Sequence, residues 1–210
     1  MALFLQHQDE VCRWAVWKME ETEEELLSIL PDADRYREEI RRFSSAHRRL
    51  EWIAVRALLF TILGEEKSIL YFDNGRPYLS DGTFSLSISH TKGYVAVILG
   101  KSADNVGIDI EQYGDRVHKV AHKFVRVDEV PGCYQGRDTW GLLLYWSAKE
   151  TMFKCLNATE VDFREHLHIF PFVVSSEGVF NAVEYRTRQN LHFEIHYRIC
   201  PDFVLTYTVC

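Results

Sequence analysis

The chain has 210 residues, of which 47% are hydrophobic, so it can bury a full core as one domain or as two small halves. Its 24 basic and 31 acidic side chains give a formal net charge of -7, which argues against bulk nucleic-acid binding. It contains no apolar run of roughly eighteen residues and no export signal, so we expect no membrane span. The 5 cysteines are scattered and never in Cys-x-x-Cys spacing, which is typical of reduced thiols in a cytoplasmic protein.

The N-terminal half mixes predicted strands and helices. The pattern predicts a strand near 11–18, helices near 22–29, 33–42 and 45–63, short extended pieces at 69–72 and 77–79, and strands at 84–89 and 94–99. Its helical region concentrates arginines, which form either a solvated helix face or a surface for phosphates or an acidic partner. These arginines are Arg35, Arg37, Arg41, Arg42, Arg48, Arg49 and Arg56.

The C-terminal half continues the mixture. The residue pattern predicts a strand at 106–111, helices at 116–124 and 139–156, and strands near 167–174, 178–185, 191–199 and 203–209. Asp138 is the expected N-cap of the second helix. Turn residues at 92–93 and 201–202 predict antiparallel hairpins, so the fold class is α+β. The polar stretch 100–105 is the expected boundary between subdomains 1–103 and 104–210.

Acidic side chains alternate with apolar ones along the strand 106–111. Because strand side chains point to opposite faces in turn, Asp109 and Glu111 project from the same face. Such a pair is usually the wet face of a half-buried sheet. Another alternating strand, at 84–89, ends by presenting Ser89 and His90, and a single histidine there is more often structural.

The helix 139–156 carries a second charged pair. Glu150 and Lys154 are four positions apart and share a face, with Trp146 one turn earlier. Such a pair is more often a solvated surface ion pair worth a few tenths of a kcal/mol. Taken together with Asp109 and Glu111, however, the set suits a magnesium ion that bridges a pyrophosphate. His118 with His122 and His166 with His168 have no further ligands at metal-site spacing, so we expect no transition-metal site there.

Four segments extend this interpretation. They are Gly-Arg-Pro-Tyr-Leu at 75–79, Ser-Ile-Ser-His-Thr at 87–91, Gly-Ile-Asp-Ile-Glu at 107–111, and Trp-x-x-Lys-Glu-x-x-x-Lys at 146–154. Their order and spacing resemble the motifs of 4'-phosphopantetheinyl transferases, and more narrowly those of the surfactin-synthetase-activating type. The resemblance covers roughly residues 31–156. A weaker fifth element, Ala-His-Arg-Arg at 46–49 followed by Arg56, resembles the helix before the first motif.

The resemblance implies an activity. Such enzymes transfer phosphopantetheine from coenzyme A to a serine of an apo acyl or peptidyl carrier protein and release adenosine 3',5'-bisphosphate. By resemblance, magnesium, or manganese in its place, is held by Asp109, Glu111 and Glu150. Glu150 takes the serine proton and Lys154 contacts the phosphates. The implied coenzyme A contacts are Arg48, Arg76, Ser89, His90 and Lys154.

The resemblance also implies an architecture: two similar α+β subdomains related by a pseudo-twofold axis, with the active site in the cleft between them. We expect a cytoplasmic monomer that binds no nucleic acid. Thr151 replaces the Ala or Ser usual after Lys-Glu, and the stretch 121–129 departs from the Phe-Phe and Glu of relatives. Two alternatives stay open, a magnesium-dependent nucleotide hydrolase without a carrier protein, and a non-enzymatic module that binds through its arginine-rich helix.

Overall fold

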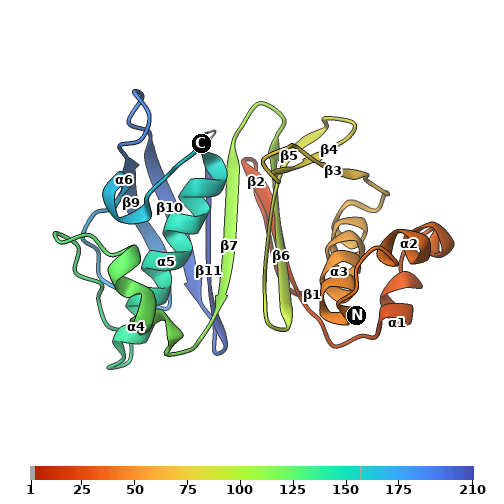
Figure 1. Cartoon of the computed structure of the whole chain (residues 1–210), viewed down its shortest axis with the longest axis horizontal. Helices are drawn as coiled ribbons and strands as arrows, with labels where there is room; N and C mark the ends of the chain where they lie inside the picture. The colour runs from red at the N-terminus through yellow and green to blue at the C-terminus, as the bar shows by residue number, and fades with distance from the viewer. Residues whose placement is uncertain (1–2, 157) are drawn as a thin grey trace. The chain divides into compact units, whose positions relative to one another are not determined.

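The computed structural model describes residues 3–156 and 158–210, and the chain forms two compact units, Met1–Ala103 and Asp104–Cys210 (Figure 1). Each unit combines an antiparallel sheet with helices, so the expected mixture of helix and strand is confirmed. Among the described residues no helix has the length and apolar character needed to span a membrane.

The N-terminal unit is built on a four-stranded antiparallel sheet in the order β1-β2-β6-β5. The strands are β1 (Leu3–Gln8), β2 (Cys12–Lys18), β5 (Phe84–Thr91) and β6 (Tyr94–Lys101). A separate hairpin joins β3 (Ile69–Tyr71) to β4 (Pro77–Leu79), and the helices are α1 (Glu23–Leu27), α2 (Ala33–Ile40) and α3 (Ala46–Leu63). The hairpin predicted at residues 92–93 is confirmed by the pairing of β5 with β6.

Strand β1 is absent from the sequence-based prediction. It pairs with one neighbour only, at the edge of the sheet, and its residues alternate between half-buried and exposed without one that is fully buried. Phe4 even exposes 42% of its surface. An edge strand of this kind lacks the contrast between apolar and polar positions on which a period-of-two prediction depends.

Helix α3 supplies much of the core of the N-terminal unit. Ser45 caps its first turn by accepting from Arg48 N, and Gly64 ends it with a φ of 72°, a left-handed conformation that glycine adopts without strain. Between these caps the buried side chains of Ile53 and Leu58 belong to the same core cluster as Trp17 of β2.

The C-terminal unit is built on a five-stranded antiparallel sheet in the order β7-β11-β10-β9-β8. The hairpin predicted at residues 201–202 is confirmed by the pairing of β10 with β11. The strands are β7 (Val106–Gln112), β8 (Leu167–Ile169), β9 (Glu177–Glu184), β10 (His192–Ile199) and β11 (Phe203–Val209). The helical elements are α4 (Arg116–Val120), the 3-10 turn η1 (Ala121–Lys123), α5 (Asp138–Cys155) and α6 (Phe163–His166).

Three local predictions for this unit are wrong. The strand expected over 167–174 ends at Ile169, because Pro171 has no N–H with which to continue a ladder. Asp138 is the first residue of α5 rather than its N-cap, which is Arg137, and its charge instead favours the positive helix start. The helix expected over 116–124 is divided between α4 and η1, and α6 was not predicted.

Helix α5 packs against β7 and β11, and Figure 1 shows it lying across that face of the sheet. Hydroxyl groups join the two layers: Ser147 Oγ lies 2.8 Å and Thr151 Oγ1 lies 2.7 Å from Thr206 Oγ1 on β11. All three side chains are fully buried. Thr151, the departure from the family pattern, therefore adds a contact that fixes the helix on the sheet.

Gly107 allows this close approach. A Cβ atom placed there would overlap the backbone oxygen of Thr151 and would lie 2.9 Å from Cys155 Sγ. We therefore expect Gly107→Ala to lower the free energy of unfolding by about 3 kcal/mol, toward the upper end of the cost of overpacking a core. Denaturant unfolding measures this loss. Gly114→Ala is the matched control, since nothing lies within 4 Å of its added Cβ, and an equal loss in both variants would contradict the packing argument.

Candidate active site

Two strand carboxylates meet the side chains of α5. Lys154 Nζ donates to the backbone oxygen of Ile108 at 2.8 Å and to Asp109 Oδ1 at 2.8 Å. Trp146 Nε1 donates to Glu111 Oε1 at 2.7 Å. Asp109 and Glu111 therefore share the face of β7 that α5 covers, as the alternation predicted. Asp109 is only 4% exposed and Glu111 is half-buried, so neither lies on a wet sheet face.

Trp146, Glu150 and Lys154 follow one another at intervals of four residues along α5, which places them on one stripe of the helix. Lys154 forms its ion pair with Asp109 on the strand. Glu150 is half-buried, and its carboxylate makes no hydrogen bond or ion pair with the described residues. The carboxylate of Glu150 thus lies between Trp146 and Lys154, which both reach β7. Glu150 and Lys154 do not form the solvated ion pair that is usual at this spacing.

The pKa values of both glutamates are raised to about 7. For Glu111 burial is the main cause, followed by the charge of Asp109, and the hydrogen bond from Trp146 opposes them. For Glu150 burial again comes first, and the charge of Asp109 adds to it. The three carboxylates therefore repel one another in a poorly solvated place. A divalent cation would relieve this repulsion and would favour their charged forms.

The donor set fits magnesium in kind, because carboxylate oxygens are the ligands that this hard cation prefers. The three carboxylates do not, however, form a compact cluster. Among residues 3–156 and 158–210, His7, Asp9 and Cys12 each place one possible ligand atom within 4.8 Å of the other two. Asp109, Glu111 and Glu150 do not lie this close together. A cation held by all three carboxylates would therefore require at least one of these side chains to move, and Lys154 already contacts Asp109 Oδ1.

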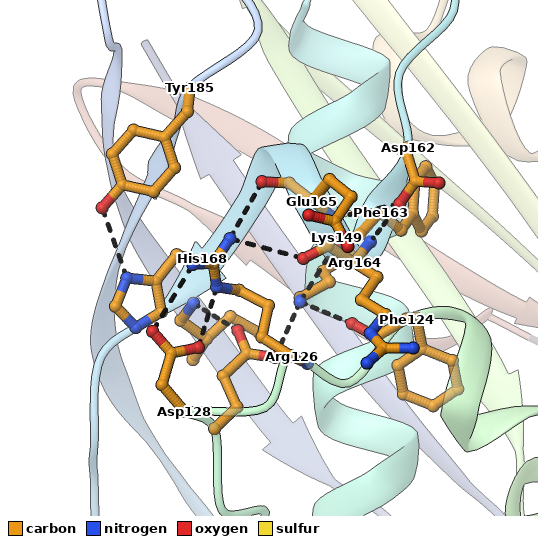
Figure 2. Close-up of polar contacts among 12 residues, drawn as sticks. Phe124, Arg126, Asp128, Lys149, Asp162, Phe163, Arg164, Glu165, His168 and Tyr185 are labelled. Carbon is orange, nitrogen blue, oxygen red and sulfur yellow. Dashed lines mark hydrogen bonds and ion pairs between the residues drawn. The ribbon is translucent and has the colours of Figure 1, made fainter.

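Lys149, the residue before Glu150, points away from this set and into the protein. Its ammonium group donates to the backbone oxygens of Phe124 at 2.6 Å and Phe163 at 3.1 Å, and to Glu129 Oε2 at 2.8 Å (Figure 2). Neither side chain of this ion pair is exposed to solvent. Burial lowers the pKa of Lys149, and the charge of Glu129 opposes that shift.

Glu129 completes the buried network. Its Oε2 also accepts from the backbone N–H of Arg126 at 2.9 Å, and its Oε1 accepts from that of Ile169 at 2.8 Å. Together with Lys149 it fixes the loop after η1 and the strand β8 to α5 next to Glu150. The sequence-based reasoning missed this pair. A signal was present, because Lys149 occupies the i+4 position of the buried stripe that Tyr145, Ala148 and Met152 define.

A second polar cluster lies in the N-terminal unit, where the start of α3 meets the end of β5. Arg48 Nη1 lies 2.8 Å from His90 Nε2 and 3.2 Å from Glu51 Oε2. His90 Nδ1 lies 3.1 Å from Glu51 Oε1. Because a guanidinium can only donate, His90 Nε2 accepts a hydrogen bond from Arg48. The proton of the neutral ring is then on Nδ1, which donates a hydrogen bond to Glu51. Glu51 is 5% exposed, whereas the Arg48 and His90 side chains are 50% and 42% exposed.

The other predicted contacts lie elsewhere in the unit. Ser89, next to His90 on β5, is 7% exposed. Arg76 is half-buried in the turn between β3 and β4, where its N–H donates to Asn74 Oδ1 at 3.0 Å. Most arginines of the helical region pair with acidic side chains, which supports the solvated-face interpretation for them. These pairs are Arg35 with Glu66, Arg37 with Glu24, Arg41 with Glu38, and Arg49 with Glu23.

A comparison with protein families bears on the class of this site. Residues 105–208 match the family described as the 4'-phosphopantetheinyl transferase superfamily. Residues 105–208 are thus similar to a domain of this superfamily. The match indicates a transferase that moves phosphopantetheine from coenzyme A to carrier proteins. No curated protein matches the sequence.

The matched segment contains one of the two clusters. Asp109, Glu111, Glu150 and Lys154 all lie inside residues 105–208, which match the superfamily, as does the buried pair of Glu129 and Lys149. The remaining predicted coenzyme A contacts lie before residue 105, outside the matched segment, so only the resemblance of their motifs supports them. These are Arg48, Arg76, Ser89 and His90.

Proposed function

We propose that the protein transfers 4'-phosphopantetheine from coenzyme A to a serine of an apo acyl or peptidyl carrier protein, as a transferase of the holo-acyl-carrier-protein synthase type. Within that class it resembles the surfactin-synthetase-activating enzymes. The observation that carries the proposal is that Asp109 and Glu111 of β7 contact Lys154 and Trp146 of α5, respectively, inside the segment that matches this superfamily. The cytoplasm is the expected compartment and the monomer the expected active species.

Asp109, Glu111 and Glu150 would hold magnesium, and manganese would fit the same oxygen ligands. When bound, the metal neutralises charge on the diphosphate of coenzyme A. Lys154 provides a compact positive charge beside the same oxygens. Since Lys154 already contacts Asp109, the lysine also holds that carboxylate in place before any ligand arrives.

Glu150 is the proposed general base for the carrier serine. A base works best when its pKa lies near the working pH, and the pKa of Glu150 is raised to about 7. The absence of a hydrogen-bond partner among the described residues leaves its oxygens available for the serine proton or a metal. The pair of Lys149 and Glu129 fixes the backbone beside it, so the base is presented from a rigid element.

Arg48 and His90 would contact the nucleotide phosphates of coenzyme A, with Ser89 and Arg76 as further contacts. The exposed ends of the Arg48 and His90 side chains are both oriented by the buried carboxylate of Glu51. A phosphate arriving from solvent would accept from the outward N–H groups of Arg48.

The nucleotide assignment predicts a selective loss of affinity. We expect His90→Ala and Arg76→Ala each to weaken binding of coenzyme A by roughly 1.5–3 kcal/mol, the range for a hydrogen bond to a charged group. The dephosphorylated analogue that lacks the 3'-phosphate should lose less. Isothermal titration measures both ligands. Arg41→Ala is a matched control, since Arg41 pairs with Glu38 on the surface, and equal losses for the two ligands would place His90 and Arg76 away from the 3'-phosphate.

The expected internal repeat belongs to the same proposal. We propose that residues 1–103 and 104–210 are two similar α+β subdomains. In support, each unit has an antiparallel sheet and one helix of 18 residues, α3 and α5, that contributes to its core. The pseudo-twofold relation between them stays a prediction.

The deciding experiment is intact-mass analysis of several apo carrier proteins incubated with the protein, coenzyme A and magnesium. We expect a mass increase of one phosphopantetheine on at least one carrier and release of adenosine 3',5'-bisphosphate. A nucleotide hydrolase with the same carboxylates would instead release free phosphopantetheine without any carrier present. A module that binds through its arginine-rich helix would leave coenzyme A intact and would bind oligonucleotides in a salt-dependent manner. Either result would overturn the proposal.

A further inference from the structure

A third cluster lies in the N-terminal unit, on the hairpin between β1 and β2. His7 lies near the end of β1, Cys12 begins β2, and Asp9 lies in the turn that joins them. One possible ligand atom of each residue lies within 4.8 Å of the other two. These atoms are an imidazole nitrogen, a carboxylate oxygen and a thiol sulfur. The cluster belongs to no part of the transferase chemistry described above.

The turn itself arranges the ligands. Asp9 Oδ1 accepts from the backbone N–H groups of Val11 and Cys12, each at 2.8 Å, and Asp9 N donates to Cys12 O at 3.1 Å. These bonds hold the carboxylate so that Oδ2 meets His7 Nε2 at 2.9 Å. The His7 ring in turn stacks on Trp14, with 5.6 Å between ring centroids, and Trp14 is its partner in the strand register. Side-chain orientation at this hairpin is therefore set by the fold before any ligand binds.

Space is available beside the cluster. A pocket of about 280 Å³ is lined by Asp9 and Cys12 together with Leu63 of α3 and Phe84 of β5. Cys12 is 7% exposed, so its sulfur is sheltered, whereas the His7 and Asp9 side chains are 36% and 46% exposed. His7 does not line this pocket, so a cation would reach the cluster from the exposed side of His7 and Asp9 and could keep a water as a further ligand.

We propose that His7, Asp9 and Cys12 bind a thiophilic divalent cation of the zinc type. Nitrogen, oxygen and thiolate sulfur are the ligand set of Zn²⁺, which four ligands surround tetrahedrally at roughly 2.0–2.3 Å. Neighbouring ligand atoms of such a tetrahedron lie about 3.3 Å apart. The present distance of 2.9 Å between His7 and Asp9 therefore needs to open only slightly. Magnesium, which avoids sulfur ligands, would not compete for this place.

The site would have a structural consequence. Strand β1 lies at the edge of its sheet, and among the described residues it pairs with β2 alone. A cation that bridges His7 of β1 and Cys12 of β2 would fasten this edge across the hairpin and would stabilise the folded chain in proportion to its occupancy. The proposal concerns the N-terminal unit only and does not depend on the transferase function.

Cobalt(II) in place of zinc gives a direct test, because a cobalt–thiolate bond produces a charge-transfer absorption in the near ultraviolet. We expect one equivalent of Co²⁺ to bind the metal-free protein with this absorption and one equivalent of Zn²⁺ to abolish it. Cys12→Ser and His7→Gln should each remove the absorption. Asp9→Asn keeps an oxygen acceptor for the turn and removes the charge, so it should bind Co²⁺ at least tenfold more weakly with the fold intact.

The double variant Cys133→Ser/Cys210→Ser is the matched control, since these are the exposed thiols and should not contribute. Circular dichroism reports whether each variant is folded. If Cys12→Ser does not fold, His7→Gln, at a partly exposed position, still decides the matter. An absorption that persists in His7→Gln, disappears in the control, or is absent from the wild-type protein would overturn the proposal.

Discussion

Glu150→Gln is expected to reduce phosphopantetheine transfer by several orders of magnitude while coenzyme A still binds. The substitution keeps the size of the side chain and removes both a charged metal ligand and the proposed base. A transfer assay with an apo carrier protein, beside calorimetric titration of coenzyme A, separates the two effects.

Asp109→Ala should likewise abolish magnesium-dependent transfer. Lys154→Ala should lose affinity and rate together, because its charge stabilises the bound diphosphate as well as the transition state.

The same Glu150 variant should not lose stability. The pKa of Glu150 is raised from 4.5 to about 7 in the folded protein, so folding favours its protonated form. That preference contributes fully to stability below pH 4.5 and is lost as the pH rises through about 7. At pH 8 the wild-type protein therefore carries a penalty for a half-buried charge that Gln does not have. We expect Glu150→Gln to melt no lower, and by this reasoning higher, than wild type at pH 8.

Glu194→Gln on β10 is a control for loss of an acidic side chain, because Glu194 is 68% exposed. It should change neither transfer nor stability. If Glu150→Gln turns over near the wild-type rate, then Glu150 is neither the base nor a required ligand. If it melts well below wild type at pH 8, the half-buried carboxylate instead contributes to stability and the electrostatic account of its pKa fails.

Lys149→Met is expected to destabilise the protein by about 3–5 kcal/mol, the cost of leaving one partner of a buried ion pair uncompensated. The variant keeps a side chain of similar length but leaves Glu129 charged in a place where neither group is solvent-exposed. It also leaves the carbonyls of Phe124 and Phe163 without the ammonium donor. Denaturant unfolding, monitored by circular dichroism, measures the loss.

Lys149→Met combined with Glu129→Gln should recover part of this stability. Glutamine removes the unpaired charge and can still accept from the backbone N–H of Ile169 or Arg126. Lys119→Met on α4 is the matched control at an exposed position and should stay within about 0.5 kcal/mol of wild type. Equal stabilities for Lys149→Met and the control would show that the buried pair contributes little. A double variant no more stable than the single one would show that charge burial is not the cause.

The predictability of the candidate site differs from residue to residue. Alternation along 106–111 was sufficient to place Asp109 and Glu111 on one face of β7, and helical spacing was sufficient to place Trp146, Glu150 and Lys154 on one stripe of α5. Spacing could not say which partner Lys154 would choose. A neighbouring glutamate four residues away and a strand carboxylate 45 residues away compete for it, and the packing of α5 on β7 favours the strand.

The elements whose side chains repeat regularly could be predicted from the sequence, because a strand or helix with one buried face leaves a period of two or of 3.6 residues. The sequence also indicated the turns with glycine or proline, such as that at Gly93, whose φ is 83°. The edge strand β1 was not found, because its residues lack that contrast. The early end of β8 did have a signal in the sequence, Pro171, which the strand predicted over 167–174 did not take into account. The pairing of Lys149 with Glu129 in the core and the convergence of His7, Asp9 and Cys12 became visible in the folded chain. Periodicity indicates which way a side chain points, whereas its partner, its burial and hence its pKa depend on which distant segment packs against that face.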